Sequence, residues 1–279
     1  SLPILFVCLL ETSAFGQSSA PARQLQSASP GFNPGVYTGR LDPAYPTPYS
    51  PASVEDIRKT LERVHAYLEE ASPLRVIDRK TGEPVTDLAK LPPEPELART
   101  DLLNLSYEWG VTYSGMLLAA EVTGDDRYRD YVNKRLDAIA RLAAHAKITG
   151  RNQGVRSVVA PHSLDDSGAM CAAMIKARRQ NIGGDLRPWI DNYLGYISLG
   201  QMRLADGTLA RNFPFPRTLW LDDLYMSVPA LAQGGKLTGD RLYFDDASNQ
   251  VLQFASRMFV KERGLFMHGW VEGMEPHPV

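Results

Sequence analysis

Two short segments of the sequence each place a pair of aspartates among residues suited to proton transfer or sugar binding. Residues 218–226 read TLWLDDLYM, and residues 161–168 read PHSLDDSG. A partly desolvated carboxyl group can donate and accept protons, and two carboxyl groups that face one bond are what a glycosidase requires. Asp222, Asp165 and Asp166 are therefore the candidate catalytic residues.

The segment from Thr218 to Met226 is expected to open a helix with two different faces. Successive helical residues are about 100° apart, which gathers four apolar side chains on one stripe: Leu221, Leu224, Val228 and Leu231. Asp222 and Met226 share roughly the opposite face, which is expected to look into a cavity. Asp223 is expected to be solvated or to support the helix cap. Simple stabilisation of acids by the helix dipole is the alternative interpretation of the pair.

Further aromatic and polar residues recur at corresponding places in the chain. His268 and Trp270 lie in a segment that is expected to be a loop, where a ring nitrogen and a flat apolar face could bind a sugar. Tyr107 opens another expected inner helix in the same way. For residues 161–168, helix capping by Ser163 or Asp165 is the alternative to catalysis.

These candidates are positioned by an internal repeat. A glycine followed by an aspartate occurs at Gly124, Gly184 and Gly239, with spacings of 60 and 55 residues. A glycine can supply the left-handed residue that ends one helix, and an aspartate favours the start of the next. Each repeat is therefore predicted to be a helical hairpin.

The two helices of each hairpin differ in composition. The segments near 99–122, 165–181 and 219–236 are rich in small and apolar residues, whereas the segments after each glycine carry more charge. Helices that are apolar nearly all round lie inside and charged ones outside. The repeat thus predicts an all-α toroid of helical hairpins, with a straight solenoid as the alternative. About three hairpins and the opening of a fourth are present, so we expect roughly half of a six-hairpin ring and a poorly stable, inactive product if the polypeptide ends here.

The N-terminal region is expected to precede the folded domain. Residues 1–16 contain a short apolar run followed by small and polar residues, which is typical of the remnant of a signal peptide and predicts export to a periplasm or beyond. A buried N-terminal strand is the alternative. Residues 17–52 are rich in Ser and Pro and predict a linker or arm, and Ser53 is expected to cap a long amphipathic helix. Residues 53–279 are then the N-terminal part of the toroid domain.

The overall composition argues against several classes of partner and cofactor. The formal net charge is −2, with 30 basic and 32 acidic residues, which favours neither nucleic acid nor an anionic membrane as a partner. Cys8 and Cys171 are too few for a disulfide framework or a cysteine metal site. No P-loop, dinucleotide-binding glycine pattern, HExxH or GxSxG motif occurs, and the five histidines lack metal-ligand spacing. We expect no cofactor and no metal, and the sequence leaves the oligomeric state open.

The motif residues resemble the unsaturated glucuronyl and unsaturated rhamnogalacturonyl hydrolases of glycoside hydrolase families 88 and 105. The most specific element is WLDxLYM at residues 220–226. Other family segments are matched in the same order by Tyr107 with Gly110, by Leu164 with Asp165, and by LFxHxW at residues 265–270. The resemblance runs from about Asp101 to the last residue, and it implies an (α/α)6 barrel.

The resemblance also implies a reaction and roles for the candidate residues. The expected substrate is an oligosaccharide, made by a lyase, whose non-reducing end is a 4,5-unsaturated uronic acid. Asp222 matches the general acid/base of the family and Asp165 its second carboxylate, with Asp166 as the adjacent alternative. The expected substrate-binding residues are Tyr107, Arg211, Trp220, Met226, His268 and Trp270.

Two other functions remain as alternatives. A helical-hairpin protein could bind glycans without turning them over. A prenyl-type site, in which paired aspartates bind Mg²⁺, is disfavoured because Met226 stands where a third acid would be needed one turn after Asp222.

Overall fold

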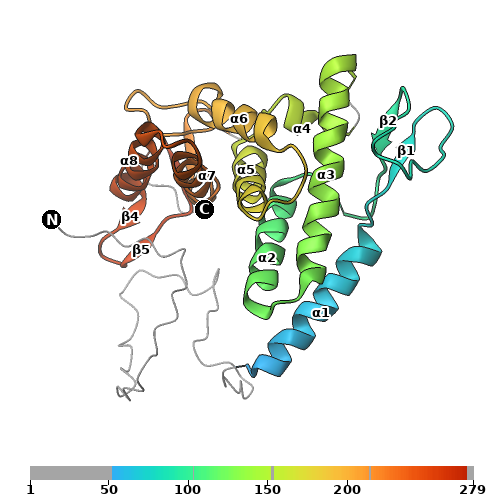
Figure 1. Ribbon diagram of the computed structural model, residues 1–279. Coiled ribbons are helices and arrows are strands. Elements are labelled where there is room, and N and C mark those ends of the chain that lie inside the picture. The colour runs from blue at the N-terminus through green and yellow to red at the C-terminus, as the bar shows by residue number, and fades with distance from the viewer. Residues whose placement is uncertain (1–51, 103, 152–153, 214, 275–279) are drawn as a thin grey trace. The chain divides into compact units, whose positions relative to one another are not determined.

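In the computed structural model, the residues are divided into a first unit, Ser1–Pro51, and a second unit, Ala52–Val279. The expected signal remnant and nearly all of the expected arm fall in the first unit, which lies outside the described residues. The structure describes residues 52–102, 104–151, 154–213 and 215–274. The second unit is built mainly from helices (Figure 1).

Helix α1 (Val54–Ala71) begins where the sequence predicts. The Ser53 hydroxyl accepts a hydrogen bond from the Asp56 amide at 3.0 Å and donates one to the Asp56 carboxylate at 2.6 Å. This pair satisfies an amide that would otherwise have no partner in the first turn. Only the last part of the predicted apolar stripe is buried, at Leu68, because Ile57 and Val64 are exposed.

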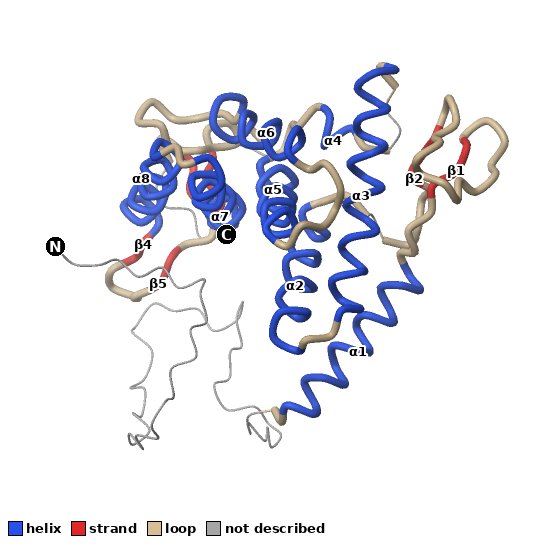
Figure 2. The backbone as a smooth tube through the Cα atoms, viewed as in Figure 1, coloured by secondary structure: helices blue, strands red, loops and turns tan. Residues whose placement is uncertain are grey.

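Three helical hairpins follow α1, and each contains an inner and an outer helix (Figures 1 and 2). The pairs are α2 (Tyr107–Thr123) with α3 (Asp126–Thr149), α5 (Leu164–Arg179) with α6 (Arg187–Gly195), and α7 (Leu221–Thr238) with α8 (Arg241–Met258). A short helix, α4 (Arg156–Val159), precedes α5, and the π-helix η1 (Tyr196–Gly200) continues α6. The inner helices α2, α5 and α7 pack side by side in that order.

The turns of the first and third hairpins have the predicted structure, and the second differs. Gly124 and Gly239 have φ angles of 71° and 77° and end α2 and α7 in the left-handed conformation. Asp125 and Asp240 then accept the amides of residues 127 and 242 and cap the outer helices. Helix α5 instead ends at Arg179, and α6 has no side-chain cap, so the predicted capping role in the second copy is wrong.

Close contacts between backbones align the inner helices. A Cβ atom at Gly110 would overlap the backbone of Ala169, and one at Gly168 would overlap the carbonyl group of Met226. Both glycines lie in the first half of their helices, near the ends that carry the candidate residues. Only glycine allows helices to approach this closely without a shift.

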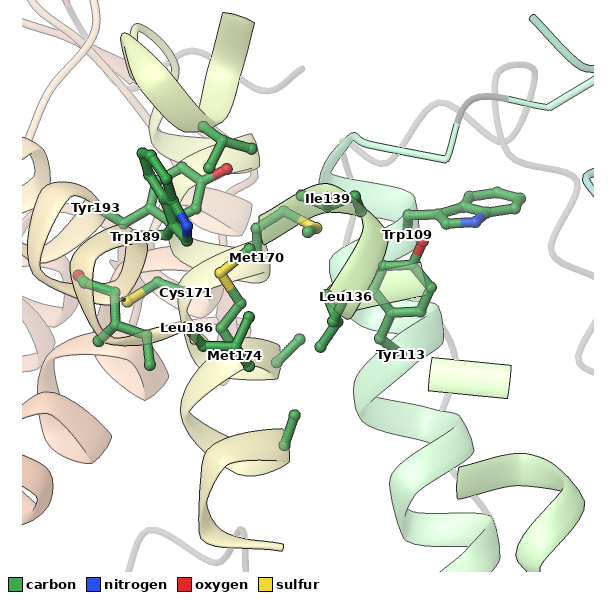
Figure 3. Close-up of a cluster of buried hydrophobic side chains, with 14 of the residues drawn as sticks. Trp109, Tyr113, Leu136, Ile139, Met170, Cys171, Met174, Leu186, Trp189 and Tyr193 are labelled. Atoms are coloured by element: carbon green, nitrogen blue, oxygen red, sulfur yellow. Dashed lines mark hydrogen bonds between the residues drawn. The ribbon is translucent and has the colours of Figure 1, made fainter. Parts of the chain in front are cut away.

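The main core lies between the inner and outer helices (Figure 3). It includes Tyr113 of α2, Leu136 of α3, Met174 of α5 and Trp189 of α6, and Cys171 is buried there as predicted. A smaller second core lies beside α8. It is formed by Leu204, Ala210, Leu219, Phe254 and Met258.

Three two-stranded antiparallel ribbons were not predicted. They pair β1 (Val76–Asp78) with β2 (Pro95–Leu97), β3 (Thr218–Trp220) with β6 (Gly269–Val271), and β4 (Phe259–Val260) with β5 (Leu265–Phe266). The β3–β6 ribbon corrects two expectations, because the third inner helix starts after a strand and residues 269–271 are not a loop. Within the described ranges, no helix combines the length and apolarity needed to cross a membrane.

Candidate active site

The candidate acids meet at the N-terminal ends of α5 and α7, which are in extensive contact (Figure 1). Asp165 lies in the first turn of α5, and Asp222 and Asp223 lie in the first turn of α7. The close approach at Gly168 brings these two turns together. The predicted convergence of carboxylates from two inner helices is therefore present.

Arg211 joins the two acidic segments. Its backbone pairs with Thr218 through hydrogen bonds of 2.9 and 3.0 Å, which fixes the base of the side chain beside β3. The Nη2 atom is 3.0 and 3.2 Å from the two carboxylate oxygens of Asp165, and it also bonds to Oδ1 of Asp223. The Nε atom donates to Oδ2 of Asp223 at 2.8 Å. The guanidinium lies 4.2 Å from the centre of the Trp220 ring, which is a favourable cation–π distance.

Asp223 is a buried member of this network. Its side chain is only 1% exposed, so the expectation that it could be solvated is wrong. Its Oδ2 atom accepts the amide of Trp220 at 3.4 Å, which confirms the alternative that it supports the helix cap. Burial raises the pKa of the Asp223 carboxyl to about 6, against the opposing effect of Arg211, and Asp165 and Asp222 raise it further.

Asp222 is the more accessible of the two neighbouring acids. Its side chain is 41% exposed, and its Oδ1 atom lies 3.5 Å from Nε2 of His268. That oxygen is shielded from solvent and has no hydrogen-bond partner among the described residues. A shielded carboxylate oxygen without a partner is suited to receive a proton or a hydrogen bond from a ligand.

Asp165 and Asp166 have different partners. Burial raises the pKa of Asp165 against the effect of Arg211, and the charge of Asp222 raises it further. Asp166 instead accepts the amide of Tyr107 at 2.8 Å and so caps α2, because Ser106 provides no side-chain cap there. Burial also raises the pKa of Asp166, while the Tyr107 amide lowers it. Asp165 therefore belongs to the hydrogen-bond network of Arg211. Asp166, the next residue of α5, instead contacts the start of α2.

The β3–β6 ribbon brings His268 to the acids. The carbonyl oxygen of His268 accepts the Leu221 amide at 2.7 Å, and its ring lies 5.6 Å from that of Trp220. Trp270 pairs with Leu219, the residue before Trp220. Because successive residues of a strand point to opposite faces, the side chain of Trp270 lies on the face opposite to that of Trp220. Its ring packs against the second core, with the Arg257 guanidinium 5.5 Å away. The structure therefore places His268, but not the ring of Trp270, beside the acids.

Tyr107 and Met226 complete the set of predicted site residues. Tyr107 is partly exposed at the start of α2, and its pKa is raised mainly by Glu108 and also by the charges of Asp165 and Asp222. It therefore shares the electrostatic environment of the acids. Met226 is buried where α7 crosses α5 at Gly168. Its contact with a substrate remains a prediction.

The sequence interpretation missed the link between Arg211 and Asp223. The spacing of Trp220 and Asp223 as N-cap and N3 residues signals the helix cap but not the contact with Arg211. A second link runs from η1, where the Tyr196 hydroxyl donates to Gln201 at 2.8 Å and the Gln201 amide donates to the carbonyl of Ala210. This link holds the chain immediately before Arg211.

The positive charge at the site is the guanidinium group of Arg211. Arg211 pairs with Asp223, one of the two neighbouring aspartates that would bind the ion in the alternative Mg²⁺ hypothesis. In the part of the chain that the structure describes, no three His, Cys, Asp or Glu side chains are grouped as metal ligands would be.

Three consecutive helical hairpins whose inner helices pack side by side are the arrangement expected of an α/α toroid. The family model of Glycosyl Hydrolase Family 88 matches residues 77–278, which is most of the chain. The chain belongs to this family. No curated protein gives a significant match.

Two solved structures show the same fold. Both are described as possible members of glycoside hydrolase family 105. The one from Klebsiella pneumoniae is 19% identical, with a TM-score of 0.56, and the match covers 85% of this chain and 57% of that protein. The one from Salmonella enterica serovar Paratyphi A is 17% identical, with a TM-score of 0.54, and the match covers 84% and 56%. The likeness confirms the predicted all-α toroid, and the chain spans little more than half the length of these two proteins.

Proposed function

We propose that this chain carries the acid/base centre of a hydrolase that removes 4,5-unsaturated uronic acid from the non-reducing end of lyase-generated oligosaccharides. Oligosaccharides of the pectin and rhamnogalacturonan type are the proposed substrates. Family membership supports the class of reaction. The position of Asp222, a partly exposed carboxylate beside a second acid held by an arginine, supports the mechanism.

The chemistry of the unsaturated sugar makes a single acid/base residue sufficient for its hydrolysis. The C4=C5 double bond of the sugar is an enol ether, and protonation at C4 leaves a positive charge on C5 that the ring oxygen shares. Water then adds at C5 and loses a proton, which gives a hemiketal. Opening of the hemiketal gives a ketone at C5 and a hydroxyl on C1, and the hemiacetal at C1 then collapses to an aldehyde and releases the attached sugar. One carboxyl group can first donate and then accept the proton.

Asp222 is proposed for this role because it differs from its neighbours in access. Asp223 is buried and Asp165 is paired with Arg211, whereas one oxygen of Asp222 has no hydrogen-bond partner among the described residues. His268 and Tyr107 border the same acids and are proposed to contact the sugar. Trp220, held under Arg211, is proposed to form part of the same wall.

The test uses the protein expressed from its natural gene and unsaturated disaccharides made by lyases from pectin, ulvan and glycosaminoglycan. Turnover removes the conjugated double bond and therefore its ultraviolet absorbance. We expect Asp222→Asn to lower kcat by about 10²–10⁴-fold, the usual contribution of general acid/base catalysis. Asp245→Asn, at an exposed aspartate of α8, is the matched control and should leave kcat unchanged.

Four outcomes would count against the proposal. Absence of turnover on every disaccharide would contradict the reaction. Binding of a disaccharide without turnover would support the non-catalytic alternative. A normal rate for Asp222→Asn would reject Asp222 as the acid/base, and loss of activity in EDTA would favour the Mg²⁺ alternative.

A further inference from the structure

Asp223 makes hydrogen bonds that no catalytic role requires. Its two oxygens bind the Nε and Nη2 atoms of Arg211, and Oδ2 also accepts the Trp220 amide. Its side chain is buried, so it does not face a ligand. A buried ion pair is weak evidence for stability, because desolvation of the two charges offsets their attraction. The pair therefore calls for another explanation.

We propose that Asp223 is a positioning residue that holds Arg211 against Asp165 and over Trp220, and so keeps Arg211 from pairing with Asp222. This inference rests on the proposed function, because it concerns the same site. It assigns the two neighbouring aspartates different tasks, with Asp222 acting on the substrate and Asp223 acting through Arg211.

The balance of charge supports this assignment. One guanidinium pairs with Asp165 and Asp223 and also feels the charge of Asp222, and an arginine side chain is long and flexible. Asp223 accepts hydrogen bonds from Nε and Nη2 of the guanidinium, and Asp165 accepts hydrogen bonds from the same Nη2. Two parallel hydrogen bonds to one carboxylate fix the orientation of a guanidinium more firmly than a single contact does. If Asp223 lost its charge, Arg211 would be free to turn toward the remaining acids, including Asp222.

The cost of burying Asp223 is consistent with a functional role. Its pKa is raised to about 6 even though it is paired with Arg211, because burial outweighs the pair. The other acids near the guanidinium have the same sign of charge. They are Asp165 on α5 and Asp222 on α7, with Asp166 next to Asp165, while His162 and His268 are the nearby groups able to carry positive charge.

A second arginine–aspartate pair in this chain provides a matched control. Arg203 binds both oxygens of Asp246 at 3.0 and 2.7 Å, and both side chains are mostly buried. This pair joins the segment after η1 to α8. Asp246→Asn should therefore weaken an equivalent pair without touching Arg211.

The experiment compares Asp223→Asn, Arg211→Gln, the double variant and Asp246→Asn in the natural protein. We expect Asp223→Asn to lower kcat by about 10²-fold, the usual effect of misplacing a catalytic group, with a smaller change in KM. As the pH rises, the Asp223→Asn variant should also lose activity at a lower pH than the unsubstituted protein does. The reason is that an arginine beside Asp222 favours loss of the catalytic proton. In the Arg211→Gln background, Asp223→Asn should change kcat by less than about twofold, because both act through the same guanidinium.

Asp246→Asn should lower the melting temperature by about as much as Asp223→Asn does, and it should leave kcat and the pH profile unchanged. Additive effects of Asp223→Asn and Arg211→Gln, or an unchanged kcat and pH profile in Asp223→Asn, would overturn the inference. A crystal structure of the Asp223→Asn protein tests the same point without turnover. Arg211 should leave its position on Asp165, and an unmoved guanidinium would overturn the inference even if the proposed reaction itself failed.

Discussion

Aspartates stand near helix N-termini at both ends of the hairpins, and the two ends treat them in opposite ways. At the glycine turns, Asp125 accepts hydrogen bonds from the backbone and side chain of Arg127, which lower its pKa. At the other end, burial raises the pKa values of Asp165 and Asp223, although Arg211 binds both. Similar Asp-Asp sequences therefore serve as helix caps in one region and as an acidic cluster around the Arg211 guanidinium in the other.

The difference shows that the function of these acids depends on their tertiary neighbours. A cap is completed within two residues, so Asp125 needs only its own helix. The cluster requires Arg211, a second helix and a glycine that lets the two helices approach. Desolvation by these neighbours moves a carboxyl group toward the pKa range in which proton transfer is effective.

The largest difference in kcat is expected between a variant that lacks an acid of the cluster around Arg211 and a variant that lacks an acid at a glycine turn. Asp165→Asn should lower kcat by about 10²-fold, because Asp165 is the second carboxylate of the proposed site. Asp125→Asn should leave kcat unchanged in the same disaccharide assay. Equal rates for the Asp165→Asn and unsubstituted proteins would remove the functional distinction between the two ends.

The next largest effect should come from the helix contact that brings the acids together. Gly168→Ala places a Cβ atom against the Met226 carbonyl and should lower the free energy of unfolding by about 1–3 kcal/mol. Gly115→Ala is the matched control, because a Cβ atom at that position of α2 meets nothing within 4 Å. It should stabilise the helix by about 0.5–1 kcal/mol. Denaturant unfolding of both variants tests this, and a neutral Gly168→Ala would show that the helices are not in close contact.

A smaller effect is expected where an aspartate is only a cap. Asp125→Ala removes the acceptor for the Arg127 amide and should lower the free energy of unfolding by about 1 kcal/mol. Thermal unfolding measures the loss. If kcat fell as well, the turn region would contribute to the site, contrary to the comparison.

The smallest effect is a difference in the pH dependence of stability. The raised pKa of Asp223 means that the native protein binds this proton more tightly than the unfolded chain does. Its stabilising contribution is present below the ordinary pKa of an aspartate and is lost as the pH rises toward about 6. The lowered pKa of Asp125 has the opposite sign, so its contribution is lost as the pH falls.

Melting temperatures measured from about pH 3 to about pH 7 test both signs. The melting temperature of the unsubstituted protein relative to Asp223→Asn should fall as the pH rises. Relative to Asp125→Asn it should instead fall as the pH decreases. The same slope for both variants would contradict the assigned pKa directions.

The hairpins could be predicted from the sequence because their signals are local. A glycine with positive φ followed by a capping aspartate marks the turns at Gly124 and Gly239, and Ser53 with Asp56 marks the start of α1. The second turn could not be predicted in this way, because Gly184 has a positive φ but α5 already ends at Arg179, and α6 has no side-chain cap.

The site could be predicted in its residue types but not in its contacts. Asp222 and Asp165 stand out by their neighbours in sequence, whereas the position of His268 depends on a strand pairing between residues about fifty positions apart. The burial of Asp223 depends on Arg211, which reaches it from outside the helix. Trp270 has the residue type of a sugar-binding side chain, but its ring packs against the second core.

The most direct test of the central claim is a crystal structure of the Asp222→Asn protein with an unsaturated disaccharide bound. The account predicts that the C4=C5 bond lies within about 3.5 Å of the side chain at position 222, which is the distance at which reacting groups meet. Arg211 and Asp165 should lie just beyond it. A disaccharide bound with its double bond away from position 222, or beside Asp125 at the turn end, would contradict the account.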